Sequence, residues 1–210
     1  MKTSSFLLFL GLSTLICAFE VDLVLADAAP EVVRDITGQK VRSGVEYHIL
    51  PVVRGRGGGL TLTSTKNGSC PFDKVQERHE VSNGLPLTLS PVNVKKEVVR
   101  LSTDLNIKFS AATTCVQSTV WKLSNFDELT RQWFVTTGGV EGNPGRETVD
   151  NWFKVDKYSA EGDDYKLVFC PTVCNFCKVI CRDVGIFLDD NGVRRLALSD
   201  SPFKIMFKRV

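Results

Sequence analysis

Cysteine is the residue type through which this chain could most readily do chemistry. Four of its seven cysteines form the pattern Cys170-x3-Cys174-x2-Cys177-x3-Cys181. The two-residue gap between Cys174 and Cys177 is typical of zinc ligands and of redox-active cysteine pairs. The same cysteines could also form disulfides, and the compartment of the chain decides among these three possibilities.

The N-terminal segment predicts an oxidising compartment. Residues 6–19 form an apolar run that is too short to span a bilayer comfortably and is typical of secretory signals. Small residues allow cleavage after Ala18 or Ala26, and we favour Ala26, which makes 1–26 the signal peptide and 27–210 the mature domain. We therefore expect a secreted protein, extracellular or vacuolar, whose six remaining cysteines form disulfides rather than a zinc or redox site.

Catalytic and cofactor chemistry find little support elsewhere in the sequence. It contains no G-x-S-x-G, H-E-x-x-H or phosphate-loop motif, and its only histidines are His48 and His79. The paired carboxylates Asp163-Asp164 and Asp189-Asp190 lie in polar segments that are typical of solvated turns. We expect no enzyme activity, no cofactor and no metal site.

The composition is that of an ordinary globular domain. Hydrophobic residues make up 43% of the chain and charged residues 24%, and the formal net charge is +2. That charge is too small for a protein that binds nucleic acid through a basic surface. No second apolar stretch reaches membrane-spanning length, so we expect neither nucleic acid nor a membrane as a partner.

The distribution of apolar residues predicts a single all-β domain. Short runs rich in Val, Ile, Leu, Phe and Thr alternate with turn residues, and no long stretch has helical periodicity. The segment Asp189-Asp190-Asn191-Gly192 predicts a hairpin, because Asn-Gly tolerates positive φ. The expected strands lie in residues 47–53, 60–64, 98–101, 105–109, 120–123, 132–136, 152–155, 165–169, 185–188, 195–198 and 203–207.

An internal repeat supports a threefold arrangement. An aromatic-x-aliphatic pattern occurs at residues 47–49, 121–123 and 165–167. Each copy is followed by a turn and a further expected strand, which favours three similar hairpin units.

Several motifs, in order along the chain, resemble the soybean Kunitz-type trypsin inhibitor family. Its N-terminal signature is similar to Val33-x-Asp35-x-Thr37-Gly38-Gln39-x-Val41, followed by Tyr47-x-Ile49. Its late strand and C-terminal hairpin resemble residues 165–171, 183–186 and 192–199. The miraculin-like subgroup is the most similar, through residues 57–61, 118–121, 138–140, 142–145 and 170–174.

The resemblance implies a β-trefoil stapled by disulfides. In this fold twelve strands have pseudo-threefold symmetry, six forming a short barrel and six capping it, which agrees with the all-β repeat above. The sequence alone does not choose among the pairings that six cysteines allow. The subgroup implies three of them: Cys70–Cys115, Cys170–Cys181 and Cys174–Cys177.

A glycosylation site is expected next to the first of these disulfides. Asn67 begins Asn67-Gly68-Ser69, a sequon without a blocking proline. Its Gly/Asn/Ser surroundings, beside Cys70, predict an exposed loop that can carry a glycan.

In the resembling family, function lies in one exposed loop that crosses a serine protease active site as a substrate would. Here that loop falls between Leu89 and Val98. The residues expected to contact the protease are Asn93, Val94, Lys95 and Lys96.

The loop register is open at this point. A trypsin-like target requires Arg or Lys at the specificity position, since the cation pairs with a buried carboxylate of the enzyme. Counting forward from Ser90-Pro91 places Asn93 there, whereas counting back from Lys108-Phe109 places Lys95 there. On charge we rank Lys95 before Lys96 and Asn93, and a merely solvated turn is the alternative.

Differences from the family pattern limit what the resemblance implies. Strong inhibitors have an asparagine that braces the loop where this chain has Ser43, and serine forms fewer hydrogen bonds over a shorter reach. We therefore expect weak to moderate inhibition. The subgroup's taste-modifying activity is linked to histidines and an interchain disulfide, and these positions are Arg56, Asn83 and Ser159 here. Neither that activity nor a disulfide-linked dimer is expected, and we predict a monomer.

Together these patterns predict a secreted plant protein that inhibits a trypsin-like serine protease in defence. The alternative from a different functional class is a non-inhibitory binding, storage or carbohydrate-binding β-trefoil protein.

Overall fold

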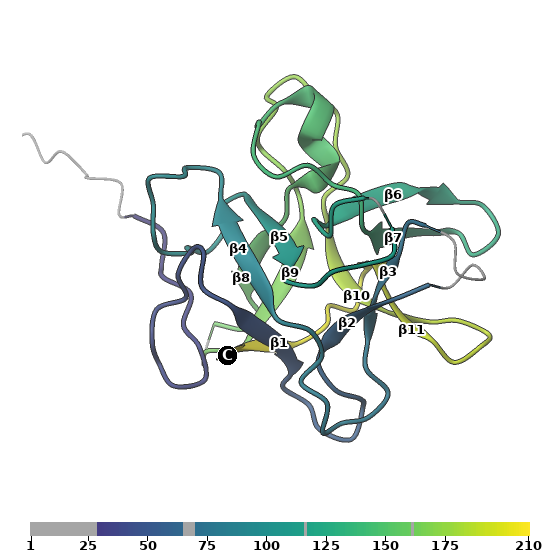
Figure 1. Cartoon of the computed structure of the whole chain (residues 1–210). Coiled ribbons are helices and arrows are strands. Elements are labelled where there is room, and N and C mark those ends of the chain that lie inside the picture. Colours follow the sequence, from purple (N-terminus) through teal and green to yellow (C-terminus); the bar gives the residue numbers. More distant parts are fainter. Residues whose placement is uncertain (1–28, 65–69, 116, 161) are drawn as a thin grey trace, which may run out of the picture.

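The computed structural model describes residues 29–64, 70–115, 117–160 and 162–210 (Figure 1). The predicted signal peptide 1–26 and the predicted glycosylation site Asn67 lie outside these ranges. The described residues form a short 3-10 helix, η1 (Arg146–Asn151), and no helix long and apolar enough to cross a membrane. They form twelve strands: β1 (Tyr47–Pro51), β2 (Leu60–Thr63), β3 (Asp73–Gln76), β4 (Leu87–Pro91), β5 (Leu105–Phe109), β6 (Lys122–Asp127), β7 (Gln132–Thr136), β8 (Lys154–Lys157), β9 (Tyr165–Phe169), β10 (Arg182–Leu188), β11 (Arg194–Ser199) and β12 (Ile205–Arg209).

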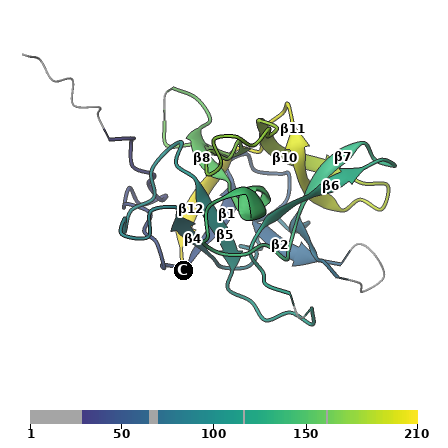
Figure 2. The ribbon, with the colours of Figure 1, turned by 90° about the horizontal axis from the view of Figure 1, so that it is seen from above.

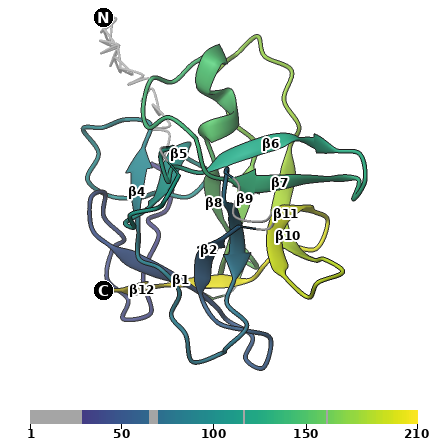
Figure 3. The same cartoon turned by 45° about the vertical axis from the view of Figure 1, so that its right-hand side comes forward.

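Six of the strands close into a barrel. β1 pairs with β4 and with β12, β4 pairs with β5, and β9 pairs with both β8 and β12, all antiparallel. A bridge between Leu105 and Phe153, just before β8, closes the ring. The pairing of β1 with β12 brings the first and last strands of the chain together, as Figure 3 shows.

The other six strands form three hairpins that cap the barrel. These are β2–β3, β6–β7 and β10–β11. Each hairpin touches the other two, because β3 pairs with β7 and β11, and β7 also pairs with β11. A six-stranded barrel with three hairpins on it is a β-trefoil, so the twelve-stranded, threefold all-β prediction is confirmed (Figure 2).

The hydrophobic core follows the strand alternation. In β4 and β9 every second residue is buried, and in β1 Tyr47 and Ile49 are, as expected for strands with one face on a core. The aromatic residues Tyr47, Trp121 and Tyr165 of the sequence repeat are all essentially buried. The second copy differs from the other two in its place, since residues 47 and 165 begin barrel strands whereas Trp121 immediately precedes the cap strand β6.

Several segments differ from the expected strands, and the barrel strand β4 (Leu87–Pro91) is one that was not expected. Residues 98–101 form only single bridges, Arg42–Val98 and Val32–Arg100, so no strand of their own. The strand β3 was not expected, because its sequence Asp-Lys-Val-Gln is mostly polar. It nevertheless lies buried between β2, β7 and β11, and Asp73 forms an ion pair of 2.9 Å with Arg195 of β11.

Three disulfides join the described cysteines. Cys70 is bonded to Cys115, Cys170 to Cys181 and Cys174 to Cys177, which is the nested pairing that the resemblance implies. The last two lie in the connection between β9 and β10. All six cysteines of the predicted mature domain are therefore in intrachain bonds.

Candidate functional site

The connection that follows β4 projects from the barrel and is fixed at both ends (Figure 1). At its start, the Val92 amide donates a hydrogen bond of 2.8 Å to the carbonyl oxygen of Asp104. At its end, the Glu97 carbonyl oxygen accepts a bond of the same length from the Ser43 amide. The intervening residues 93–97 are all exposed. The connection is thus a short exposed loop between two anchored stems, and we call residues 92–97 the projecting loop.

A tight turn forms the tip of the projecting loop. The carbonyl oxygen of Asn93 accepts a hydrogen bond of 2.9 Å from the Lys96 amide. The side-chain Oδ1 of Asn93 also accepts one of 3.2 Å from the Lys95 amide. Asparagine is favoured at the first position of such turns, because its side chain mimics a backbone acceptor. The Asn93 side chain is therefore engaged within the loop, and Val94 and Lys95 occupy the centre of the turn.

The lysine side chains at the tip carry uncompensated charge. Neither Lys95 nor Lys96 has an ion-pair partner among the residues that the structure describes, and both are exposed. Val94 beside them is 87% exposed. The loop therefore presents one apolar and two cationic side chains to an approaching molecule.

Ser43 contacts the projecting loop through its backbone alone. Its amide binds Glu97, and the bridge between Arg42 and Val98 continues this pairing toward the barrel. Within the described part of the chain the Ser43 hydroxyl forms no hydrogen bond to the loop. The second stem is thus held, while the turn itself receives no side-chain support from this position.

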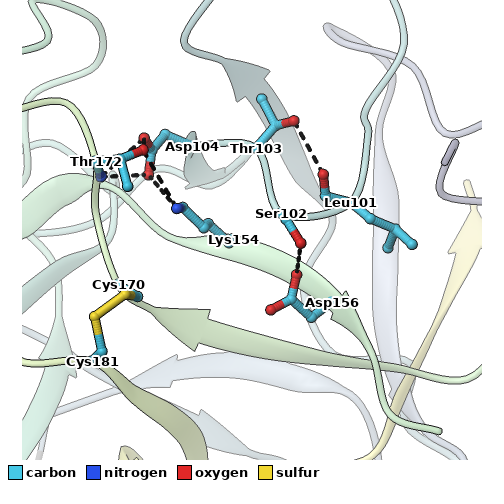
Figure 4. Close-up of polar contacts among 9 residues, drawn as sticks. All are labelled: Leu101, Ser102, Thr103, Asp104, Lys154, Asp156, Cys170, Thr172 and Cys181. Carbon is cyan, nitrogen blue, oxygen red and sulfur yellow. Dashed lines mark hydrogen bonds and ion pairs between the residues drawn. A yellow bond between two sulfur atoms is a disulfide. The ribbon is translucent and has the colours of Figure 1, made fainter. Parts of the chain in front are cut away.

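Asp104, which anchors the first stem, also holds the disulfide-bonded segment, and Figure 4 shows its contacts with that segment. Its carboxylate, which is 5% exposed, accepts hydrogen bonds from the amide and the hydroxyl of Thr172. The Lys154 ammonium lies 3.8 Å from the same carboxylate and also bonds the Thr172 hydroxyl at 3.4 Å. Thr172 lies between Cys170 and Cys174, so the segment 170–181 and the projecting loop are held by one residue.

The base of the β4–β5 hairpin has a second support. Glu141 accepts a hydrogen bond of 2.6 Å from the Ser90 hydroxyl and forms an ion pair of 3.3 Å with Lys108. Deeper in, the buried Asn106 side chain accepts a bond from the Gly142 amide at 2.7 Å and donates one to the Asn151 carbonyl at 2.9 Å. The segment before η1 thus fixes the two strands that carry the projecting loop.

The Cys70–Cys115 disulfide encloses the projecting loop in the sequence. The bond spans 45 residues, which include β3, β4, the loop and β5. A single cut within residues 92–97 would therefore leave the two parts covalently joined. Together with the two anchored stems, this connection favours retention of the loop geometry after cleavage.

Sequence reasoning placed Asn93, Val94, Lys95 and Lys96 in one loop, and the structure brings them together in one turn. It did not identify Asp104, whose role depends on contacts with Lys154 and Thr172. These residues lie 50 and 68 positions further along the chain. A lone aspartate between two strands carries no signal of such contacts. The described residues also contain no group of three or more His, Cys, Asp or Glu side chains placed to hold a metal ion.

The strongest electrostatic perturbation lies outside the loop, at Lys74 of β3. Burial lowers the pKa of its ammonium well below the usual range, and the neighbouring Asp73 carboxylate opposes this shift. The ammonium bonds the Thr119 carbonyl at 3.3 Å and lies 5.3 Å from the Phe109 ring centre. This position is sealed in the core, so it affects stability rather than contact with another molecule.

Comparison with known proteins gives consistent matches over nearly the whole described chain. Residues 33–209 match the legume Kunitz family model, described as trypsin and protease inhibitor. Kunitz trypsin inhibitor 5 of Arabidopsis thaliana is 58% identical over 89% of both chains, and miraculin of Synsepalum dulcificum is 55% identical over 89% of this chain and 87% of its own. Among solved structures, the potato Kunitz-type cysteine protease inhibitor PCPI-3 has a TM-score of 0.74 and 31% identity, covering 86% of this chain and 98% of its own.

Proposed function

The chain belongs to the Kunitz family of trypsin and protease inhibitors, and on this premise we propose that it inhibits a trypsin-like serine protease through the projecting loop. The observation that carries the proposal is the turn of residues 93–96, which presents a lysine between two anchored stems. The family consists of inhibitors and other non-enzymatic proteins, so the chain is not an enzyme.

In the proposed complex the projecting loop occupies the protease active site as a substrate would. A cationic side chain enters the specificity pocket and pairs with the carboxylate at its base. Because both stems are hydrogen-bonded before binding, the loop loses little conformational entropy on association. The same bonds keep the cut ends in place, and the disulfide from Cys70 to Cys115 keeps them on one molecule.

Lys95 is the residue that we assign to the specificity pocket. Its ammonium has no ion-pair partner in the described chain, and it lies at the centre of the turn. Asn93 could enter the pocket only by giving up the bond that its side chain makes to the Lys95 amide. It would also leave the carboxylate of the pocket without a cation, which is unfavourable by several kcal/mol.

We propose that inhibition is weak to moderate. Ser43 holds the second stem through its amide, and its hydroxyl adds no hydrogen bond to the described residues of the turn. A turn supported only by its own hydrogen bonds retains more freedom than one held by a neighbouring side chain. That freedom raises the entropy cost of binding and eases cleavage.

The setting of this activity is also a proposal. The predicted signal peptide 1–26 supports secretion to an extracellular or vacuolar site, and Asn67 supports a glycan there. Pairing of all six mature cysteines within the chain supports a monomer. With plant relatives that include a protein named as a trypsin inhibitor, these points support a role in defence against serine proteases.

A titration tests the proposal. Trypsin and chymotrypsin are each titrated with the purified mature protein, and we expect inhibition of trypsin in preference to chymotrypsin. Lys95→Ala should weaken trypsin inhibition at least tenfold, about 1.4 kcal/mol. Lys122→Ala removes an equal charge from an exposed position of β6 and should leave inhibition unchanged.

Two results would decide against the assignment. Inhibition lost in Asn93→Ala but kept in Lys95→Ala and Lys96→Ala means that Asn93 occupies the pocket. No inhibition of either protease by the parent protein favours the non-inhibitory binding or storage alternative on the same scaffold.

A further inference from the structure

A hollow lies away from the projecting loop. It is bounded by the end of β1, the β10–β11 hairpin and the segment 201–204, and its volume is about 330 Å³. This is within the size range of small-molecule sites in proteins. In Figures 1 and 2 the β10–β11 hairpin and the connection after β4 lie on opposite sides of the molecule. We call this feature the hairpin hollow.

Exposed apolar side chains gather around the hairpin hollow. Val53 is 51% exposed, Leu188 60% and Tyr158 41%, and all three line it. Phe203, which is half-buried and packs against the core, forms part of its lining as well. Large apolar side chains from three separate segments, exposed around one concavity, are more typical of a binding site than of scattered surface residues.

Two arginines add uncompensated positive charge to the same hollow. Arg194 is half-buried, and its Nε donates a hydrogen bond of 2.8 Å to the Gln76 side chain, which fixes the guanidinium. Arg56 has no ion-pair or hydrogen-bond partner among the residues that the structure describes. Burial, and next the positive charge of Arg56, lower the pKa of Arg194 from its usual value. An anion between the two guanidinium groups would relieve this repulsion.

The third cation of the hollow is already neutralised. Lys204 forms an ion pair of 2.7 Å with Asp164, and its ammonium lies 5.1 Å from the Tyr158 ring centre. None of the described residues that line the hollow is acidic. The charge left for a ligand is therefore that of Arg56 and Arg194, beside an apolar wall.

We propose that the hairpin hollow binds a small organic carboxylate with an aromatic or aliphatic body. The guanidinium groups of Arg56 and Arg194 hold the carboxylate, and Val53, Leu188 and Phe203 contact the apolar body. Arginine suits this role because its planar donors match both oxygens of a carboxylate. The volume admits a molecule of one or two rings or a short alkyl chain, and a larger ligand would extend into solvent.

The test uses matched charged and uncharged probes on the full mature protein. Naphthalene-2-carboxylate and 2-(hydroxymethyl)naphthalene have nearly the same shape, and their binding is followed by calorimetry and by amide chemical shifts. We expect the carboxylate to bind at least tenfold more tightly than the alcohol. The largest shifts should fall in residues 51–56, 186–194 and 201–204.

Variants separate the charged from the apolar contribution. Arg56→Gln and Arg194→Gln should each weaken carboxylate binding at least threefold, and Leu188→Asn should weaken binding of both probes. Arg56 and Leu188 are exposed, so the Arg56→Gln and Leu188→Asn variants should keep the fold. They therefore test the proposal even if Arg194→Gln destabilises the protein through loss of its contact with Gln76. Arg146→Gln removes an exposed arginine from η1 and is the matched control, with no expected change.

Three outcomes would overturn the proposal. They are equal affinity for carboxylate and alcohol, unchanged affinity in both arginine variants, and no saturable binding of either probe below about 5 mM. The last result would mean that the hollow receives a protein surface or remains solvated. The variants of the hairpin hollow should inhibit trypsin as the parent does. A failure of this proposal can therefore be distinguished from a failure of the proposed inhibitory function.

Discussion

The Val92 amide lies 2.8 Å from the carbonyl oxygen of Asp104, whose carboxylate in turn holds Thr172. The start of the projecting loop and the disulfide-bonded segment 170–181 are therefore attached to the two ends of one residue. Shifting the Asp104 backbone would move the first stem, and the buried carboxylate resists that shift through its bonds to Thr172 and Lys154. The loop geometry thus depends on a distant part of the chain.

Replacing Asp104 should destabilise the protein strongly. Asp104→Ala removes the acceptor for two Thr172 hydrogen bonds and leaves the Lys154 ammonium, 11% exposed, without its carboxylate. Breaking a buried pair by removing one partner costs about 3 kcal/mol or more of unfolding free energy. Urea unfolding measures this loss. Asp156→Asn, which alters a more exposed bond to Ser102, is the control and should cost less than about 1 kcal/mol.

Substitutions at Asn93 distinguish a supporting residue from a specificity residue. Asn93→Ala removes the acceptor for the Lys95 amide. Such a hydrogen bond contributes about 1 kcal/mol, so we expect trypsin to cleave the loop of this variant roughly fivefold faster. Asn93→Asp keeps an acceptor oxygen and should be cleaved at nearly the parental rate. Mass spectrometry of timed digests gives both rates. Equal acceleration in the two variants would show that the turn does not depend on this bond.

The disulfides should contribute unequally to stability. Cys70 and Cys115 are 45 residues apart, and the chain-entropy model gives their bond about 4 kcal/mol. Cys174 and Cys177 are 3 residues apart, for which the same model gives about 2 kcal/mol. Thermal or urea unfolding of the two double Cys→Ser variants measures the difference. A Cys70→Ser, Cys115→Ser variant as stable as the parent contradicts the structural role of this bond.

Lys74 should make stability depend on alkaline pH. Burial lowers its pKa in the folded chain, whereas in the unfolded chain the pKa returns to about 10.4. Between these two values the unfolded chain binds more protons, so the unfolding free energy rises with pH, by up to about 1.4 kcal/mol per unit. Below this window the cost of burying the lysine is complete, and above it the cost disappears.

The variant Lys74→Met removes this titration while filling similar space. Its unfolding free energy should exceed that of the parent by more at about pH 8 than at about pH 10, as measured by urea unfolding at both values. A difference that is the same at the two pH values would mean that the folded protein accommodates the protonated lysine without cost.

Much of the fold could be predicted because many strands coincide with short runs of β-branched, aromatic and aliphatic residues bounded by turn residues. The segments 105–109, 132–136 and 165–169 are strands with the predicted bounds. β4 was missed although its residues alternate between buried and half-buried, and the other failures occur where tertiary contacts override local pattern. β3 buries a lysine and pairs Asp73 with Arg195 of β11. β6 continues beyond the predicted end at residue 123 through an irregularity between Leu123 and Phe126.

The position of the candidate site could be predicted from the sequence, but the contacts that hold the projecting loop in place could not. The resemblance located the loop between Leu89 and Val98, and its exposed lysines follow from polarity alone. Val92 is anchored by Asp104, which lies 12 positions away in the sequence. Ser90 contacts Glu141, which lies 51 positions away. Single-sequence patterns are local, so they carry no information about such pairs.

The most direct measurement of the central claim is the position of the first trypsin cut, determined together with inhibition. The mature protein is incubated with trypsin, residual activity is recorded, and the products are analysed by mass spectrometry before and after reduction. We predict inhibition with a first cut after Lys95 and fragments that separate only on reduction, because Cys70–Cys115 joins them. A first cut after Lys96 would contradict the assignment of Lys95. Cleavage at several other lysines and arginines without inhibition would contradict the inhibitory role of the projecting loop itself.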